Sequence, residues 1–349
     1  MKKKFHTAAS IVYAAVAFIL IIDSPFAINS AKNALTMCFN IIIPSLFPLC
    51  VLTSLLTDQL LTNQYRSLNI IEKLCNMNSN SANIFFAGLL GGYPLGARLT
   101  ANAYRDGAIS KKQALQMLAF SSNAGPAFIF GLCTSLFTNH LAALCLWSIH
   151  ICTAILTARM MPSDGSTPPT APHKIKSIQE TVQSAVKTMG NICGWIILFR
   201  IIAAFVDRWL LFMLPPIISS IVQCALELST GIINLGSIKN ELARFIICSG
   251  ALSFGGICVI LQTKSVINGL SIEPYIRGKL IQTPISCILA FLTGGVLLHS
   301  NFTMLSPLIP PLIIFFAVIL QKTMAFFRKI IYNTENKPAR SLLCCFAKK

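Results

Sequence analysis

The sequence predicts an all-α polytopic membrane protein, and three observations lead to that fold class. Hydrophobic residues make up 54% of the 349-residue chain and charged residues only 11%, whereas charged residues are about 25% of an ordinary soluble domain. The apolar residues gather in runs of about 20, the length that crosses a bilayer as a helix. The basic residues lie at the chain ends and between these runs, as the positive-inside bias requires.

The apolar runs predict about eight full transmembrane helices. We expect these spans at 8–28, 34–57, 114–137, 141–158, 188–206, 241–262, 283–299 and 307–326. Two further apolar segments, 83–97 and 216–236, are interrupted by Gly, Pro or a charged residue. They are predicted to be broken or re-entrant helices, because Gly and Pro interrupt a regular helix.

The order of these segments predicts two repeats. A Pro/Ser/Thr-rich stretch at 161–187 is typical of a linker. Pairing NAGPAFI with SFGGICV aligns Gly125 with Gly255, a weak internal repeat. If the N-terminus, linker and C-terminal tail are cytoplasmic, the two interrupted segments enter from opposite sides and the repeats are inverted. The resulting regions are an N-terminal helix (1–33), a first repeat (34–160), the linker, a second repeat with a terminal helix (188–326) and a basic tail (327–349).

The N-terminal apolar stretch has two interpretations. Its basic start and apolar run of about 16 residues resemble a secretory signal peptide. We expect an uncleaved helix instead, because a chain with many later spans needs no removable signal. Asp23 and Pro25 can end that helix.

Several functional classes lack their usual sequence features. The formal net charge of +17 does not predict nucleic-acid binding, because no basic stripe with interleaved aromatic residues accompanies it. The 13 cysteines form no CxxC pair and mostly lie in apolar runs, which predicts packing rather than a metal site or cofactor. HExxH, GxSxG and GxxxxGK[ST] are absent, so neither an enzyme nor an ATP-driven pump is expected.

The interrupted segments supply the candidate binding site. Every backbone N–H and C=O in hydrocarbon needs a partner, so a broken helix persists only beside protein or a polar cavity. Broken helices in paired repeats are typical of transporter sites near the bilayer midplane. The candidate binding side chains are Tyr93, Asn123, Glu227, Ser229 and Ser253. The backbone of the breaks is predicted to include Gly91, Gly92, Pro94, Gly125, Pro126, Gly255 and Gly256.

Glu227 is a carboxylate within the strongly apolar segment 216–236. A charge at the bilayer centre costs at least about 2.5 kcal/mol on insertion scales. Glu227 is therefore predicted to bind substrate, carry a proton or hold a cation beside Ser229 and Thr230. The alternative is that it reaches an interface or pairs with Arg200. The segment GGYPLGA likewise has a structural alternative, a tight helix-packing turn.

Five motifs, in order along the chain, resemble the sporulation integral membrane protein YlbJ family. They are LFPLCVLTSLL (46–56), GLLGGYPLGARL (88–99), LAFSSNAGPAFIFG (118–131), LELSTG (226–231) and SFGGICVILQT (253–263). This family belongs to the wider group with the nucleoside-recognition Gate domain. The resemblance implies a multipass protein of endospore-forming bacteria that is needed for the spore cortex, in the mother-cell membrane or the outer membrane of the forespore.

From the residues and the resemblance together we expect a secondary transporter or permease. Its cargo would be a small polar solute, nucleoside-like or related to the cortex, coupled to H⁺ or Na⁺. The alternative is a non-transporting membrane scaffold or regulator of cortex assembly. The expected partners are the lipid bilayer and either a second copy of the chain or cortex-assembly proteins.

Overall fold

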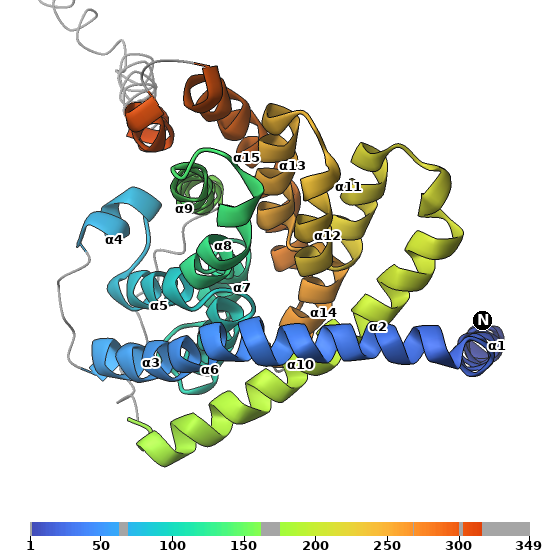
Figure 1. The fold of residues 1–349 in the computed structure, drawn as a ribbon. Coiled ribbons are helices and arrows are strands. Elements are labelled where there is room, and N and C mark those ends of the chain that lie inside the picture. The colour runs from blue at the N-terminus through green and yellow to red at the C-terminus, as the bar shows by residue number, and fades with distance from the viewer. Residues whose placement is uncertain (1, 63–68, 162–174, 268, 300–302, 316–349) are drawn as a thin grey trace, which may run out of the picture.

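The computed structural model describes residues 2–62, 69–161, 175–267, 269–299 and 303–315, and the described part contains helices and no strands (Figure 1). The predicted all-α class is confirmed. The described residues include 5 helical segments long and apolar enough to cross a membrane, which fits a polytopic membrane protein. These segments are Ser24–Thr62, Ala142–Met160, Ile178–Trp209, Glu241–Val266 and Glu273–Leu298.

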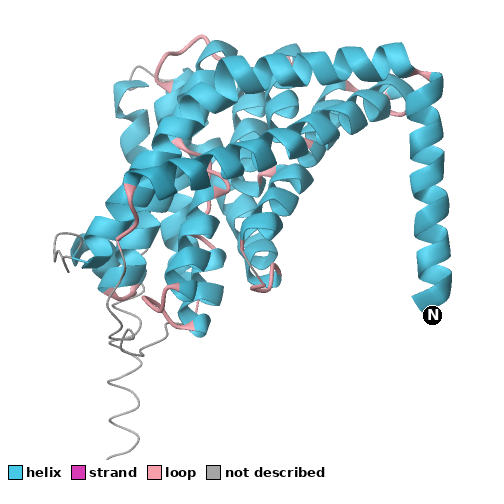
Figure 2. Ribbon diagram, turned by 90° about the horizontal axis from the view of Figure 1, so that it is seen from below, coloured by secondary structure: helices cyan, strands magenta, loops and turns pink. Residues whose placement is uncertain are grey.

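The N-terminal helices form a long arm along one side of the molecule. Helix α1 (Lys2–Ile22) ends before Asp23, and α2 (Ser24–Met37) continues through a π-helical turn into α3 (Ile43–Thr62). The first helix ends near Asp23, as predicted, but the predicted span 8–28 is divided there, because residues 24–28 belong to α2 and to the continuous segment Ser24–Thr62. Figure 2 shows α1 running away from the helical body, whereas α2 and α3 lie along it.

The remaining helices are divided by the linker region. Before it lie α4 (Asn69–Cys75), α5 (Ser79–Gly91), α6 (Leu95–Arg105), α7 (Lys111–Leu118), α8 (Pro126–Cys133) and α9 (Ala142–Met160). After it lie α10 (Ile178–Trp209), α11 (Pro216–Leu226), α12 (Leu228–Asn234), α13 (Glu241–Phe254), α14 (Gly256–Val266) and α15 (Glu273–His299). The last ten residues of the predicted linker, 178–187, belong to α10, which Ser177 begins with a capping box.

Four of the helix breaks within the described residues contain or adjoin the predicted site residues, and we number these four in chain order. The first break is Gly92–Pro94, between α5 and α6, and the second is 119–125, between α7 and α8. The third break is Glu227, between α11 and α12, and the fourth is Gly255, between α13 and α14. The first and third breaks confirm the predicted interruptions in 83–97 and 216–236.

The second break corrects the predicted full span 114–137, whereas the predicted span 241–262 is confirmed as the candidate span Glu241–Val266, with the fourth break inside it. Gly125, Pro126, Gly255 and Gly256 lie at these breaks, as predicted. The apolar runs 114–137 and 241–262 are each two half-helices, because Gly125–Pro126 and Gly255 interrupt them. Gly255 has a φ of +83°, a left-handed conformation that glycine adopts without a steric penalty. The predicted span 307–326 is described only in part, and the predicted tail, 327–349, lies outside the described residues. Within the described part that run holds the apolar helix Ser306–Phe315.

Two hydrophobic cores hold the helices together. The larger core joins α5 to α9 with α13 and α15. The smaller core packs the α2–α3 arm against α10, where Ala185, Met189, Ile192, Ile196 and Phe199 repeat at helical spacing. The α2–α3 segment and α10 therefore form one wall, and residues of the first two breaks, such as Tyr93 and Ala124, belong to the larger core.

Candidate functional site

The four breaks contact one another through positions that lack a side chain. A Cβ added at Gly92 would lie 2.9 Å from the amide nitrogen of Gly125, so the first and second breaks cross backbone to backbone. A Cβ at Gly256 would lie 2.8 Å from the carbonyl oxygen of Cys224, which brings the fourth break against the third. The Tyr93 hydroxyl donates to the carbonyl oxygen of Leu252 over 2.9 Å. The first break is thereby joined to the fourth.

A small cavity of about 40 Å³ lies where these breaks meet. We call it the inner cavity. Tyr93, Gly125, Glu227 and Ser229 line it, so four of the predicted site residues come together. The remaining lining includes Gln262 of α14 and apolar side chains from the wall, such as Ile192 and Ile196 of α10.

Glu227 is held as the N-cap of α12. Its Oε1 accepts from the amide of Ser229 at 2.9 Å, and its Oε2 accepts from the amide of Thr230 at 2.8 Å. The carboxylate is only 2% exposed, and it lies where the positive end of a helix dipole stabilises an anion. The Thr230 hydroxyl donates to Oε2 at 2.6 Å and accepts from Arg200 Nη1 at 2.9 Å. Arg200 is therefore connected to Glu227 through a hydroxyl group.

Asn123 and Ser253 belong to a polar network behind the inner cavity. Asn123 Oδ1 accepts from Lys279 Nζ at 3.2 Å and from Gln282 Nε2 at 3.0 Å. His150 Nε2 accepts from the backbone amide of Ala124 at 2.7 Å, and its Nδ1 lies 3.4 Å from the Ser253 hydroxyl. The network joins the second break to the end of α13. Asn123 and Ser253 thus support the cavity and do not line it.

The sequence reasoning missed Lys279, Gln282 and His150. Lys279 lies between the predicted spans 241–262 and 283–299, but α15 begins at Glu273 and Lys279 is fully buried. A signal was present, because Lys279, Gln282, Ser286 and Thr293 recur at the spacing of one helix face. All four are 0% exposed. A polar stripe with this period in an apolar run indicates a face turned toward the protein interior.

A wider pocket of about 480 Å³ lies beside the third break. We call it the outer pocket, since the predicted orientation places the C-terminal end of α10 outside. Its polar lining comes from α2, α10, α11 and α12: Asn29, Ser30, Asn33, Arg200, Asp207, Arg208, Gln223, Thr230 and Asn234. Asp207 accepts from Gln223 at 3.0 Å. Both hydrogen-bond partners of Arg200 in the described part of the chain, Thr230 and Met37, are neutral.

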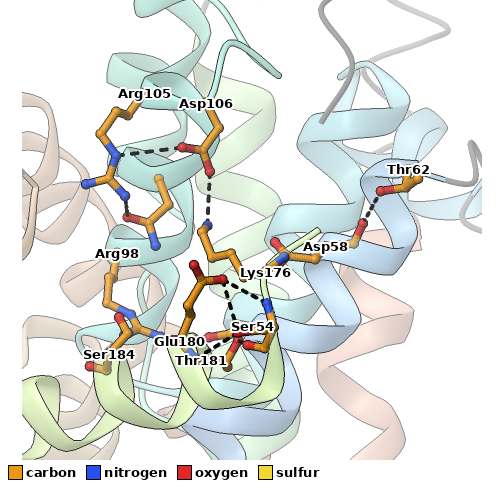
Figure 3. A network of polar contacts seen from close by, with 12 residues as sticks. Ser54, Asp58, Thr62, Arg98, Arg105, Asp106, Lys176, Glu180, Thr181 and Ser184 are labelled. Atoms are coloured by element: carbon orange, nitrogen blue, oxygen red, sulfur yellow. Dashed lines mark hydrogen bonds and ion pairs between the residues drawn. The ribbon is translucent and has the colours of Figure 1, made fainter. Parts of the chain in front are cut away.

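A third polar cluster surrounds Arg98 at the other end of α10 (Figure 3). Arg98 directly follows the predicted interrupted segment 83–97, but it lies in α6 and is 6% exposed. Its guanidinium donates to Thr188 Oγ1 at 2.8 Å, to Ser54 Oγ at 2.7 Å and to Ser184 Oγ at 3.2 Å. Lys176 pairs with Asp106 at 3.0 Å beside it. These contacts tie α3, α6 and α10 together around a cavity of about 50 Å³.

One helix, α10, borders all three sites. Thr181 and Ser184 line the Arg98 cavity, Ile192 and Ile196 line the inner cavity, and Arg200 lines the outer pocket. Residues three or four apart share a helix face, so one side of α10 passes each site in turn. Along α10, the inner cavity therefore lies between the hydrogen-bonded Arg98 cluster and the wide, polar outer pocket.

Comparison with known proteins supports one family. The chain is similar to Sporulation integral membrane protein YlbJ of Bacillus subtilis (strain 168), with 25% identity over 308 residues, 73% of this chain and 74% of the relative. The resemblance to the YlbJ family is confirmed. No family model matches the chain, and no solved structure matches it. The Gate-domain relationship stays a prediction.

Proposed function

We propose that this chain acts in sporulation as a secondary transporter that moves a small polar solute across a membrane, in support of spore cortex formation. The sporulation role is supported by the similarity to the relative named Sporulation integral membrane protein YlbJ. Transport is supported by one observation above the others: residues of three helix breaks, together with α14 after the fourth break, line a cavity that contains the buried carboxylate of Glu227. Transport rather than enzymatic catalysis is the activity proposed.

The sizes of the sites support a closed centre and an accessible entrance. An inner cavity of about 40 Å³ has room for water-sized species, whereas small-molecule sites usually measure about 300–1,000 Å³. The outer pocket, about 480 Å³, is in that range. A solute would enter the outer pocket first, and the breaks would then move apart to admit it to the inner cavity. The Arg98 cluster would keep the other end closed at that stage.

The polar lining of the outer pocket favours particular solute chemistry. Arg200 presents a guanidinium whose described partners are neutral, and guanidinium binds carboxylate or phosphate groups strongly. Asn29, Asn33 and Asn234 add amide groups that both donate and accept hydrogen bonds. A small solute with an acidic group uses both features. An uncharged nucleoside would use the amides alone.

The link through Thr230 supports coupling between the pocket and the carboxylate. A solute anion on Arg200 competes with the Thr230 hydroxyl for the same guanidinium. Release of Thr230 would alter the hydrogen bonding of Glu227 Oε2, because the same hydroxyl donates to it. Occupancy of the outer pocket is thus transmitted to the third break.

Uptake into proteoliposomes tests the proposal. The purified full-length chain would be reconstituted and offered labelled small carboxylates, amino sugars, nucleosides and nucleobases, with Glu227→Gln beside the wild type. Lys264→Ala is a suitable control, since Lys264 is an exposed residue near the end of α14. We expect saturable uptake of one solute class that Glu227→Gln abolishes and Lys264→Ala retains. Folded protein that takes up none of them would favour the scaffold alternative.

A further inference from the structure

Lys279 is a buried lysine with three neutral oxygen acceptors within the described residues, and three acceptors match the charged ammonium form, since a neutral amine has only two N–H donors. Its Nζ donates to the carbonyl oxygen of Ser122 at 2.6 Å, to Gln282 Oε1 at 2.7 Å and to Asn123 Oδ1 at 3.2 Å. An ammonium group has three donors, so these oxygens satisfy all of them. The side chain is 0% exposed. A charge buried in a membrane protein is costly and is usually retained for a function.

Two aromatic rings complete the surroundings of the ammonium. Lys279 Nζ lies 4.9 Å from the ring centroid of Tyr93 and 5.4 Å from that of Tyr275. Both distances are within the range of a cation–π interaction. Tyr93 also lines the inner cavity, so one ring separates the ammonium from that cavity.

The backbone geometry brings Lys279 to the second break. A Cβ added at Gly278 would lie 1.9 Å from the carbonyl oxygen of Ala119, so only a glycine lets α15 approach so closely. Gly96 of α6 approaches from another side, since a Cβ there would lie 1.9 Å from the carbonyl oxygen of Ser121. The second break is thus enclosed by backbone. Its carbonyl oxygens follow the C-terminal end of α7, where a helix dipole favours positive charge.

Carbonyl and amide oxygens from an interrupted helix are the ligands that hard cations prefer. Unwound backbone carbonyls of broken helices are also the groups that coordinate Na⁺ in many secondary transporters. The oxygens around Lys279 Nζ have this chemistry, and a covalently attached ammonium occupies their centre.

We propose that the Lys279 ammonium is a built-in cation that fills a site for a small monovalent cation. The chain consequently needs no free Na⁺ or K⁺ to hold the second break in its binding geometry. The filled cation site is inferred from the contacts of Lys279 Nζ alone. Its consequence, that solute binding is independent of Na⁺, rests on the proposed transport function.

Chemical replacement of the ammonium tests the proposal. Thermal unfolding of the full-length chain in detergent would be followed in choline, sodium, potassium and n-propylammonium chlorides at equal ionic strength. Wild type, Lys279→Ala and the control Lys264→Ala would be compared. In choline, Lys279→Ala should unfold about 10 °C below wild type, because three buried oxygens lose their donor. Propylammonium should restore part of that loss saturably in Lys279→Ala alone, while equimolar propanol should not.

Two results would overturn the proposal. The first is a folded Lys279→Ala protein that no cation stabilises more than it stabilises wild type. The second is saturable stabilisation of wild type by Na⁺ relative to choline, which requires no variant and decides the question even if Lys279→Ala fails to fold. Lys279→Gln, tested in the same salts, provides a milder neutral variant.

Adding solute separates this inference from the proposed function. A solute-dependent shift of wild type that persists in choline supports both. A shift that requires Na⁺ contradicts the built-in cation and leaves transport supported. If no solute shifts wild type but propylammonium rescues Lys279→Ala, the cation site stands and the transport proposal fails.

Discussion

The two buried charges of the centre, Glu227 and Lys279, are held in opposite ways. Glu227 lies at the start of α12 and accepts from amides that have no partner within the helix. Lys279, which belongs to α15, donates to oxygens of the second break, the segment that follows the C-terminal end of α7. Each break exposes one end of a helix and is matched by a charge of the opposite sign. Electrostatics thus explains why two charges are stable in an apolar chain.

The two charged side chains differ in their access to the inner cavity. Glu227 lines the inner cavity, whereas Tyr93 stands between Lys279 and that cavity. We therefore expect Glu227 to respond to solute and Lys279 to hold the second break in place. Substitutions near each charge can test this division of roles.

The largest effect is expected at the glycines that enclose the second break. Gly278→Ala and Gly96→Ala place a Cβ 1.9 Å from a backbone oxygen, so the helices must separate at a cost of about 3 kcal/mol. Size-exclusion chromatography in detergent should show a strong loss of folded protein. Gly194→Ala is the matched control, because nothing lies within 4 Å of its added Cβ. It should be neutral or slightly stabilising by up to about 1 kcal/mol, and equal loss in all three would disprove the close approach.

Glu227→Gln should remove activity with a smaller effect on folding. The amide retains one oxygen acceptor and loses the other, so the free energy of unfolding should fall by about 1.5 kcal/mol. Membrane abundance should stay near that of wild type while solute-dependent stabilisation disappears. Quantitative blotting alongside the uptake assay checks both. A loss of abundance equal to the loss of uptake would show that Glu227 is only a structural cap.

Gly125 and Gly255 should both be sensitive to substitution, for different reasons. Leucine at either position should impair function, and damage at only one would weaken the predicted pairing of the repeats. Gly255 has a φ of +83°, and asparagine tolerates that conformation better than alanine, so Gly255→Asn should be milder than Gly255→Ala. Gly125 is limited by space, since its Cβ would lie 3.0 Å from Gly92 Cα. Gly125→Asn should be no milder than Gly125→Ala in the same unfolding assay.

The smallest effect is expected in the outer pocket. Arg200→Gln keeps hydrogen-bond donors but removes the charge, so the affinity for an acidic solute should fall by about tenfold, or about 1.4 kcal/mol. Binding of an uncharged solute should hardly change. Titrations by thermal shift would compare the two classes. Equal weakening of both would show that Arg200 positions Thr230 and does not recognise an anion.

The sequence was sufficient to predict the class and residues at each of the four breaks, although only two of the breaks were placed in interrupted segments. Gly91, Gly92 and Pro94 interrupt one apolar run and Glu227 another, and each interruption is a local signal. Gly125, Pro126, Gly255 and Gly256 were also predicted in the backbone of the breaks, but the apolar runs that contain them were assigned to full spans, because hydropathy measures length and apolarity and does not register backbone conformation. The way in which the breaks contact one another depends on close backbone approaches, such as that of Gly92 to Gly125, between distant parts of the chain.

Only part of the candidate site was predicted, because some of its residues are brought together by contacts between distant parts of the chain. Tyr93, Glu227 and Ser229 lie in interrupted segments and were found to line the inner cavity. Lys279 lies outside the predicted spans, where the positive-inside bias usually places basic residues. Only its three-dimensional neighbours, Ser122 and Asn123, explain its burial. The inverted arrangement of the repeats stays a prediction.

The central claim is that the breaks form a solute site organised around Glu227. The most direct test is thermal unfolding of the purified protein against nucleosides, nucleobases, amino sugars and small carboxylates, with Glu227→Gln measured beside wild type. A ligand at 100 times its Kd stabilises the folded state by about 2.7 kcal/mol, which is measurable. We predict a saturable shift with one solute class in wild type and none in Glu227→Gln. The same shift in both proteins, or no shift in well-folded wild type, would contradict the claim.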